Sequence, residues 1–130
     1  MDQAVGRILV VDDEPKICAV LNAFLKARGY QVVSASSGDE AMTAILRERP
    51  DVVLLDIRMP EMDGKALFQH IRALDPKTCV ILITDDGDEE QAKQFLAMGA
   101  FDCVAKPFDL TYLDRTVVAL VTERRMETSS

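Results

Sequence analysis

The residues of this sequence that are best suited to chemistry stand at the ends of apolar runs. They are Asp12 and Asp13 after "RILVV", Asp56 at the end of "DVVLLD", Thr84 at the end of "CVILIT", and Lys106 after "FDCVA". A carboxylate at the end of a buried strand, such as Asp56, is costly unless other charges compensate it. Asp56 is therefore either an ordinary turn residue at the surface or one member of a charged site.

Taken together, these residue types indicate phosphoryl transfer. Clustered carboxylates repel one another unless a cation lies among them, and oxygen ligands favour Mg²⁺ or a similar hard ion. Beside such an ion, the Asp56 carboxylate could attack a phosphoryl group as a nucleophile. The ion and Lys106 would offset the charge that develops on the phosphoryl oxygens, and Thr84 could donate a hydrogen bond to one of them.

These residues can meet only if the apolar runs form neighbouring strands. Three of the runs are continuously apolar, which is typical of strands buried on both faces of a parallel sheet. Amphipathic helical patterns separate the runs, the first from about Pro15 to a stop at Gly29. Strands are expected at 7–12, 31–36, 51–56, 79–84 and 101–105, and further helices at 38–48, 64–74, 88–98 and about 109–124. This alternation predicts a doubly wound α/β sheet with helices on both faces.

In such a sheet, ligands bind at the carboxyl ends of the strands, near the point where the strand order reverses. Four strands would deliver the three aspartates, the threonine and the lysine to this edge. Each acid alone could be a helix cap, and Glu14 is expected to be no more than that. Because four separate strands each contribute a polar residue, the arrangement favours a functional site.

Composition limits the classes of protein that fit. The chain has 130 residues, enough for one domain, 48% of them hydrophobic, and a net charge of −7. That charge argues against direct binding of nucleic acid, and no apolar stretch approaches the ~20 residues of a membrane helix. Cys18, Cys79 and Cys103 show no CxxC or Cys/His spacing, which indicates reduced thiols in a cytoplasmic protein. The lone His70 is expected at a solvated helix position.

Four sequence blocks together resemble the receiver domain of two-component response regulators. They are "VVDDE" (10–14), "LLDIRMPEMDG" (54–64), "LIT" (82–84) and "AKPF" (105–108), in the usual order and at the usual distances. The resemblance covers about residues 6–123 and implies a flavodoxin-like (βα)5 domain with strand order 2-1-3-4-5. It divides the chain into a receiver domain over 1–123 and a tail, or the start of a linker to an effector, over 124–130.

The resemblance also implies a role for each site residue. Asp56 would be the phosphoacceptor, Thr84 and Lys106 would contact the phosphoryl group, and the Lys106–Pro107 peptide bond would be cis. The donor would be a phosphohistidine on a sensor histidine kinase or a phosphotransfer protein. The domain would then be a signalling switch that assists its own phosphorylation and dephosphorylation, not a turnover enzyme.

For the metal, the resemblance implies a Mg²⁺ site. Its ligands would be Asp13, Asp56 and the main-chain carbonyl of Arg58, with Asp12 acting mainly through a metal-bound water. Arg58 also argues against a phosphatase of the haloacid dehalogenase type, because those enzymes need a second acid at this position, two residues after the nucleophile.

Three residues depart from the family pattern, namely Asp85, Cys103 and Phe101. Asp85 follows Thr84, where a small residue usually keeps the phosphoryl pocket open, and this favours the alternative of a receiver-like interaction module that works without phosphorylation. If Arg58 forms an ion pair with Asp85 or Asp86, it would hold the acid away from the mouth of the phosphoryl pocket. Cys103 replaces an aromatic ring that is thought to turn inward on activation.

Phe101 lies two residues before Cys103 on the same strand face, so it either supplies the missing ring or packs under the helix at 88–98. The surface formed by the helix at 88–98, the strand at 101–105 and the last helix carries Phe101, Cys103 and Tyr112. It is the expected surface for a homodimer or an effector.

Overall fold

The computed structural model describes residues 5–59, 63–85 and 87–128. Within this part of the chain, strands and helices alternate without exception. The strands are β1 (Arg7–Val11), β2 (Gln31–Ala35), β3 (Val52–Asp56), β4 (Cys79–Thr84) and β5 (Asp102–Ala105). The helices are α1 (Pro15–Lys26), α2 (Gly38–Arg47), α3 (Gly64–Leu74), α4 (Glu89–Ala97) and α5 (Leu110–Thr128).

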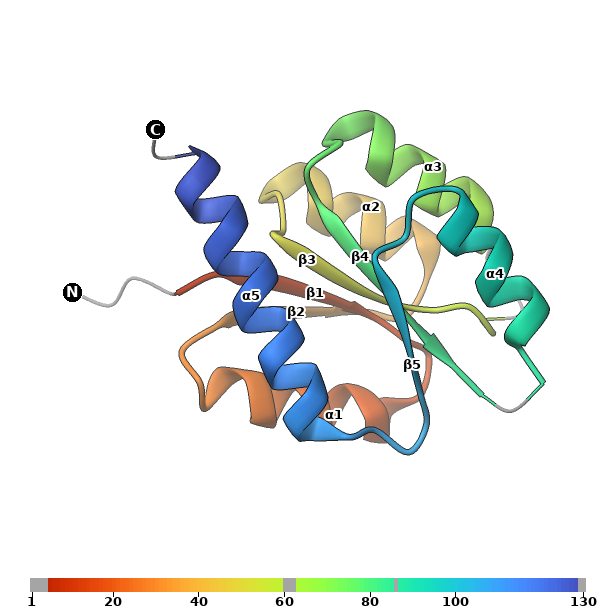
Figure 1. The fold of residues 1–130 in the computed structure, drawn as a ribbon, viewed down its shortest axis with the longest axis horizontal. Helices are drawn as coiled ribbons and strands as arrows, with labels where there is room; N and C mark the ends of the chain where they lie inside the picture. Colours follow the sequence, from red (N-terminus) through yellow and green to blue (C-terminus); the bar gives the residue numbers. More distant parts are fainter. Residues whose placement is uncertain (1–4, 60–62, 86, 129–130) are drawn as a thin grey trace.

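The strands form one parallel sheet in the order β2-β1-β3-β4-β5 (Figure 1). This is the flavodoxin-like order that the resemblance implies, and the prediction is confirmed. Because β1 lies between β2 and β3, the direction of the crossovers reverses between β1 and β3. The carboxyl ends of these two central strands therefore border the place where α/β sheets of this kind bind ligands.

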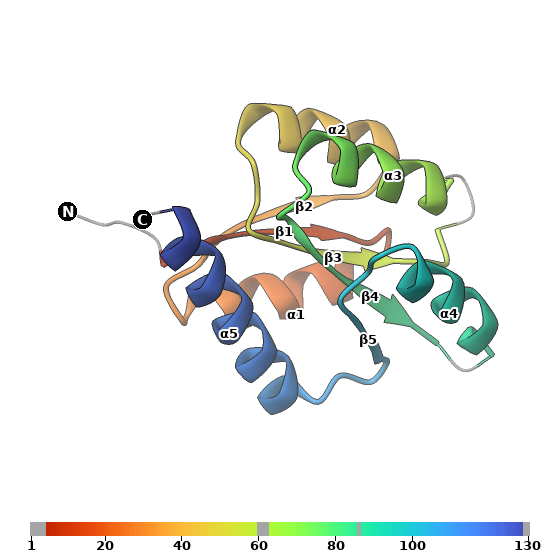
Figure 2. The same cartoon turned by 45° about the horizontal axis from the view of Figure 1, so that its top comes forward.

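Helices cover both faces of the sheet, with α1 and α5 on one side and α2, α3 and α4 on the other (Figures 1 and 2). Side chains of each central strand alternate between the two cores. In β1, Ile8 and Val10 pack with α1 and α5, whereas Leu9 and Val11 pack with the other three helices. The continuously apolar runs are thus buried on both faces, because both faces of each strand contribute to a core.

Local sequence signals determine several helix ends. At the start of α2 and of α3, Ser37 and Asp63 each accept a hydrogen bond from the main-chain N–H three residues later, at 3.1 Å. Gly29 after α1 and Gly99 after α4 have φ angles of 94° and 114°. Most other residues avoid this left-handed conformation, so the predicted stop at Gly29 is confirmed, and Gly99 ends α4 in the same way.

The C-terminal segment differs from the predicted tail. The expected boundary after residue 123 falls inside α5, which continues to Thr128. Arg124 holds this part of the helix on the body of the domain, since its guanidinium lies 2.8 Å from Asp51 Oδ1 and 2.6 Å from Asp75 Oδ2. Arg125 also pairs with Asp51, at 2.9 Å. A linkage to an effector domain stays a prediction.

Some expectations from composition can also be compared with the structure. Cys18, Cys79 and Cys103 are all free, as predicted. His70 is exposed on α3, which also agrees with the prediction. Across the described ranges, no helix combines the length and the apolar character needed to cross a membrane.

The Arg124 ion pairs lead to a prediction about stability. Arg124→Gln should lower the free energy of unfolding by roughly 3 kcal/mol, because buried Asp51 and partly buried Asp75 lose the cation that they share. Arg125→Gln is the matched comparison, since its side chain is 43% exposed, and it should cost less than about 1 kcal/mol. Urea unfolding at neutral pH measures both changes. Losses of equal size would contradict the assignment of Arg124 as the anchor of α5.

Candidate functional site

The carboxyl ends of four strands meet at one edge of the sheet and bring the predicted residues together. Asp12 follows β1, Asp56 ends β3, Thr84 ends β4 and Lys106 follows β5. Thr84 is in register with Ala105, the residue before Lys106. The parallel register therefore places residues that are far apart in the chain at the same level of the sheet.

Three aspartates form a compact acidic cluster at this edge. One carboxylate oxygen from each of Asp12, Asp13 and Asp56 lies within 4.8 Å of the others. Asp12 is 1% exposed and Asp56 is 3% exposed, whereas Asp13 is open to solvent. Carboxylates this close repel one another, and a hard divalent cation is the partner that such an oxygen set suits.

Asp12 carries the clearest sign of a cation site. Its Oδ1 accepts a hydrogen bond from the Glu14 N–H at 2.9 Å, but its buried Oδ2 accepts none from any described residue. Burial, together with the nearby charge of Asp56, raises the pKa of Asp12 to about 6, against the opposing effects of the Glu14 N–H and Lys106. Because buried oxygens normally have a partner, Oδ2 fits a role toward a cation or a water bound to one.

The two oxygens of Asp56 have different surroundings. Oδ1 accepts a hydrogen bond from the main-chain N–H of Arg58 at 2.8 Å. Oδ2 lies 3.5 Å from the ammonium nitrogen of Lys106. One oxygen is thus held by the loop after β3, and the other faces the cation supplied by β5.

Lys106 is the cation at the centre of the acidic residues. Its Nζ lies 2.6 Å from Glu14 Oε1, 3.5 Å from Asp56 Oδ2 and 3.6 Å from Asp12 Oδ2. Burial alone would lower the pKa of Lys106, but the hydrogen bond to Glu14 and the charges of Asp56 and Asp12 raise it well above its usual value. The ammonium group therefore stays charged. The Lys106–Pro107 bond is cis, as predicted.

The sequence analysis did not foresee the part that Glu14 plays here. Glu14 occupies the N-cap position of α1, as expected, but its side chain makes no capping hydrogen bond. Its carboxylate instead binds Lys106, which lies 92 positions further along the chain. The only signal in the sequence is a third acid in "VVDDE", which a helix cap explains equally well.

Thr84 is buried at the same edge. Its hydroxyl donates to the main-chain carbonyl of Val104 in the neighbouring strand at 3.4 Å. This long hydrogen bond is weak, so the hydroxyl can exchange it for a stronger acceptor. The residue after it, Asp85, is only partly buried.

The structure shows a partner of Arg58 that the sequence did not suggest. Its Nε lies 2.5 Å from Oδ1 of Asp88, a residue that the sequence analysis did not consider for the site. The other oxygen of Asp88 accepts a hydrogen bond from the Asp85 N–H at 2.7 Å. Asp86, the other predicted partner, lies outside the described residues.

The aromatic departures can also be located. Phe101 is 53% exposed in this structure, and both roles considered for its ring stay predictions. Cys103 is partly buried and packs against the core under α2, α3 and α4. Tyr112 on α5 is exposed, and its hydroxyl donates to the carboxylate of Asp102. On the predicted partner surface, Phe101 and Tyr112 are exposed and Cys103 is partly buried.

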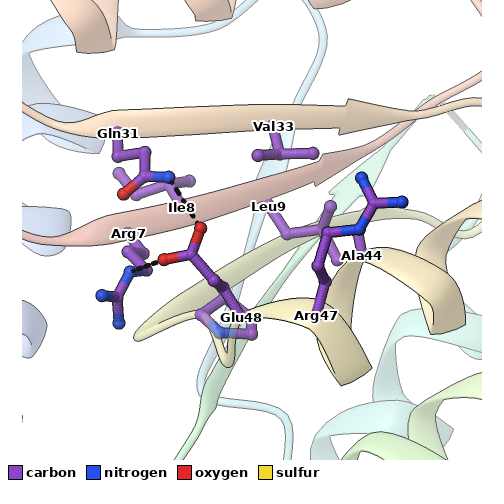
Figure 3. Close-up of a pocket in the computed structure, with 9 residues that line it drawn as sticks. Arg7, Ile8, Leu9, Gln31, Val33, Ala44, Arg47 and Glu48 are labelled. Atoms are coloured by element: carbon purple, nitrogen blue, oxygen red, sulfur yellow. Dashed lines mark hydrogen bonds and ion pairs between the residues drawn. The ribbon is translucent and has the colours of Figure 1, made fainter.

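A separate pocket lies between β2 and α2, and Figure 3 shows the side chains that line it. Leu9, Val33 and Ala44 contribute apolar surface. At its rim, Glu48 pairs with Arg7 at 2.9 Å and accepts a hydrogen bond from Gln31 at 3.2 Å. None of the predicted site residues lines this pocket, so it is distinct from the acidic edge.

Comparison with known proteins gives relatives with consistent descriptions. Regulatory protein AtoC of Escherichia coli is 39% identical over 127 residues, covering 98% of this chain and 26% of AtoC. Sporulation initiation phosphotransferase F of Bacillus subtilis is 36% identical over 104 residues, covering 80% of this chain and 84% of that protein. The chain therefore spans about a quarter of AtoC, at 26%, but most of the Bacillus protein.

Solved structures agree with these relatives. The crystal structure of the receiver domain of NtrX from Brucella abortus has a TM-score of 0.83 and 32% sequence identity, and the match covers 88% of this chain and 98% of that one. Residues 8–118 match the family model for the response regulator receiver domain. With the five-stranded parallel sheet and the convergent acidic edge, these matches show that the chain belongs to the response regulator receiver domain family.

Proposed function

We propose that the domain accepts a phosphoryl group on Asp56 and acts as a conformational switch in two-component signalling. The geometry of Asp56 carries this proposal, because its Oδ1 is held by the Arg58 N–H and its Oδ2 faces Lys106 Nζ at 3.5 Å. Oδ2 is then the attacking atom. A new O–P bond forms as the P–N bond of a phosphohistidine donor breaks, and the leaving imidazole nitrogen keeps the electron pair and takes a proton from solvent.

The donor in this proposal is a sensor histidine kinase or a phosphotransfer protein. The name of the Bacillus relative, a phosphotransferase, supports phosphoryl exchange between proteins. Lys106 pairs with the negative charge that grows on the phosphoryl oxygens. The Thr84 hydroxyl gives up its weak bond to Val104 and donates to one of those oxygens.

Mg²⁺ is the proposed cofactor. Asp13, Asp56 and the main-chain carbonyl of Arg58 would hold the ion, and Asp12 would act through a bound water. The acidic cluster supports this assignment, and so does Asp12 Oδ2, which accepts no hydrogen bond from the described residues. When bound, the ion neutralises part of the charge of the aspartates and of the phosphoryl group.

For output, we propose the surface formed by α4, β5 and α5. It carries exposed apolar side chains, namely Leu96, Phe101 and Tyr112, which are suitable contact anchors. The partner would be a second copy of the chain or an effector, in the cytoplasm, and the net charge of −7 disfavours direct contact of this domain with nucleic acid.

The test of the proposed function is substitution of the acceptor. Asp56→Asn should lower incorporation of an acid-labile phosphoryl group at least about 100-fold, because the nucleophilic carboxylate is lost. Mass spectrometry after incubation with acetyl phosphate and Mg²⁺ measures the yield, and Asp39→Asn, at an exposed position of α2, is the control. If the unsubstituted protein takes no phosphoryl group and traps no beryllofluoride, the alternative of an interaction module without phosphorylation is correct.

A second prediction concerns the metal. Mg²⁺ at ten times its dissociation constant should add about 1.4 kcal/mol to the free energy of unfolding and raise the melting temperature by roughly 3–6 °C. Asp13→Ala should lose most of this rise, because it removes one ligand. Thermal melts with and without millimolar Mg²⁺ measure the effect. An equal rise in Asp13→Ala would show that the ion acts on general surface charge.

A third prediction concerns the partner surface. Phe101→Ala should weaken self-association of the beryllofluoride-activated domain about fivefold or more, because an exposed aromatic anchor is lost, and it should leave the phosphorylation yield unchanged. Sedimentation equilibrium measures the association. Leu46→Ala is a matched control, since Leu46 is 67% exposed on α2, away from this surface. If both variants associate like the parent, Phe101 is no contact anchor.

A further inference from the structure

The carboxylate of Asp88 links the two loops that border Asp56. Its Oδ1 lies 2.5 Å from Arg58 Nε in the loop after β3. Its Oδ2 accepts the Asp85 N–H, in the loop after β4, at 2.7 Å. Since the main-chain N–H of Arg58 donates to Asp56 Oδ1 at 2.8 Å, a continuous set of contacts runs from Asp88 to the acceptor.

Helix capping does not explain this carboxylate. Asp88 stands at the N-cap position of α4, yet its side chain makes no capping hydrogen bond. Asp63, at the same position of α3, does cap its helix. Asp88 is also only 2% exposed, and a buried charge needs compensation, which Arg58 and the Asp85 N–H supply. Burial tends to raise the pKa of Asp88, but these two partners bring it below its usual value.

We propose that Asp88 is a positioning residue for phosphoryl transfer to Asp56 and that it acts through Arg58. Asp88 holds the half-exposed Arg58 side chain through the contact of 2.5 Å between its Oδ1 and Arg58 Nε. The held side chain keeps the Arg58 N–H on Asp56 Oδ1. The carboxylate then cannot rotate, and Oδ2 remains the oxygen that faces Lys106. The expected effect on phosphoryl transfer rests on the proposed function. The effect of Asp88 on the hydrogen bond between the Arg58 N–H and Asp56 does not depend on phosphorylation.

The first experiment measures the structural part alone. Asp88→Asn keeps the size of the side chain and removes its charge, so the Arg58 amide proton should exchange with water up to about tenfold faster, as expected when one hydrogen bond is weakened. NMR in metal-free buffer measures the rate. Asp109→Asn is the matched control, because Asp109 also stands at a helix start and accepts the Tyr112 N–H at 3.1 Å. Unchanged exchange in Asp88→Asn would overturn the proposal.

The second experiment measures the chemical consequence. With phosphoramidate, a P–N bond breaks, ammonia leaves, and an O–P bond forms on Asp56. The rate constant should fall about tenfold in Asp88→Asn, because the nucleophile is misplaced. It should fall by the same factor with acetyl phosphate, which carries a different charge, and should stay within about twofold of the parent in Asp109→Asn. A rate in Asp88→Asn equal to that of the parent would overturn the proposal.

A double substitution tests whether Asp88 acts through Arg58. Arg58→Gln should slow the reaction by a similar factor, and the double variant should be no more than about twofold slower than either single one. Multiplied losses would mean that the two residues act separately, which would overturn the proposal. If Asp88→Asn does not fold, Arg58→Gln takes its place, because it also removes the ion pair between residues 58 and 88. The exchange rate of the residue 58 amide proton is then measured in that variant. If the parent accepts no phosphoryl group, the proposed function fails, and amide exchange still decides about Asp88.

Discussion

Two carboxylates that are almost completely buried, on Asp12 and Asp56, set the condition that the rest of the site has to satisfy. Both stand at the carboxyl ends of central strands, and each carries a charge that burial disfavours. Lys106 offsets part of that charge at 3.5 and 3.6 Å but is itself drawn toward Glu14 at 2.6 Å. The negative charge of this edge is therefore only partly neutralised by Lys106. An added cation would neutralise more of it and is suited to bind there.

The fold creates this condition through its strand order. Because β1 lies between β2 and β3, the loops after β1 and β3 turn toward opposite faces of the sheet and leave the strand ends accessible. Asp12 and Asp56 are therefore held by rigid strands, while the loops that follow carry the adjustable contacts. Arg58 lies in the loop after β3 and Asp88 in the loop after β4, and their ion pair joins these two loops.

A second charged cluster lies at the opposite end of the sheet and has a different consequence. There Arg124 stands between Asp51 and Asp75, and both acids have short contacts with it. These contacts compensate the buried charge directly, so the cluster needs no added ion and serves to hold α5. The contrast with Asp12 Oδ2, which accepts no hydrogen bond from the described residues, separates a stabilising cluster from a site that is suited to binding.

The sequence by itself determined the strands, the helices and the convergence of Asp12, Asp56, Thr84 and Lys106, because hydrophobic periodicity defines the elements and parallel strands place their ends at one edge. Only the tertiary structure decided which charged side chains pair. The Lys106–Glu14, Arg58–Asp88 and Arg124–Asp51 pairs join residues 92, 30 and 73 positions apart. No local pattern encodes such pairs, because the choice among several acids within reach of one cation depends on how loops and helices pack.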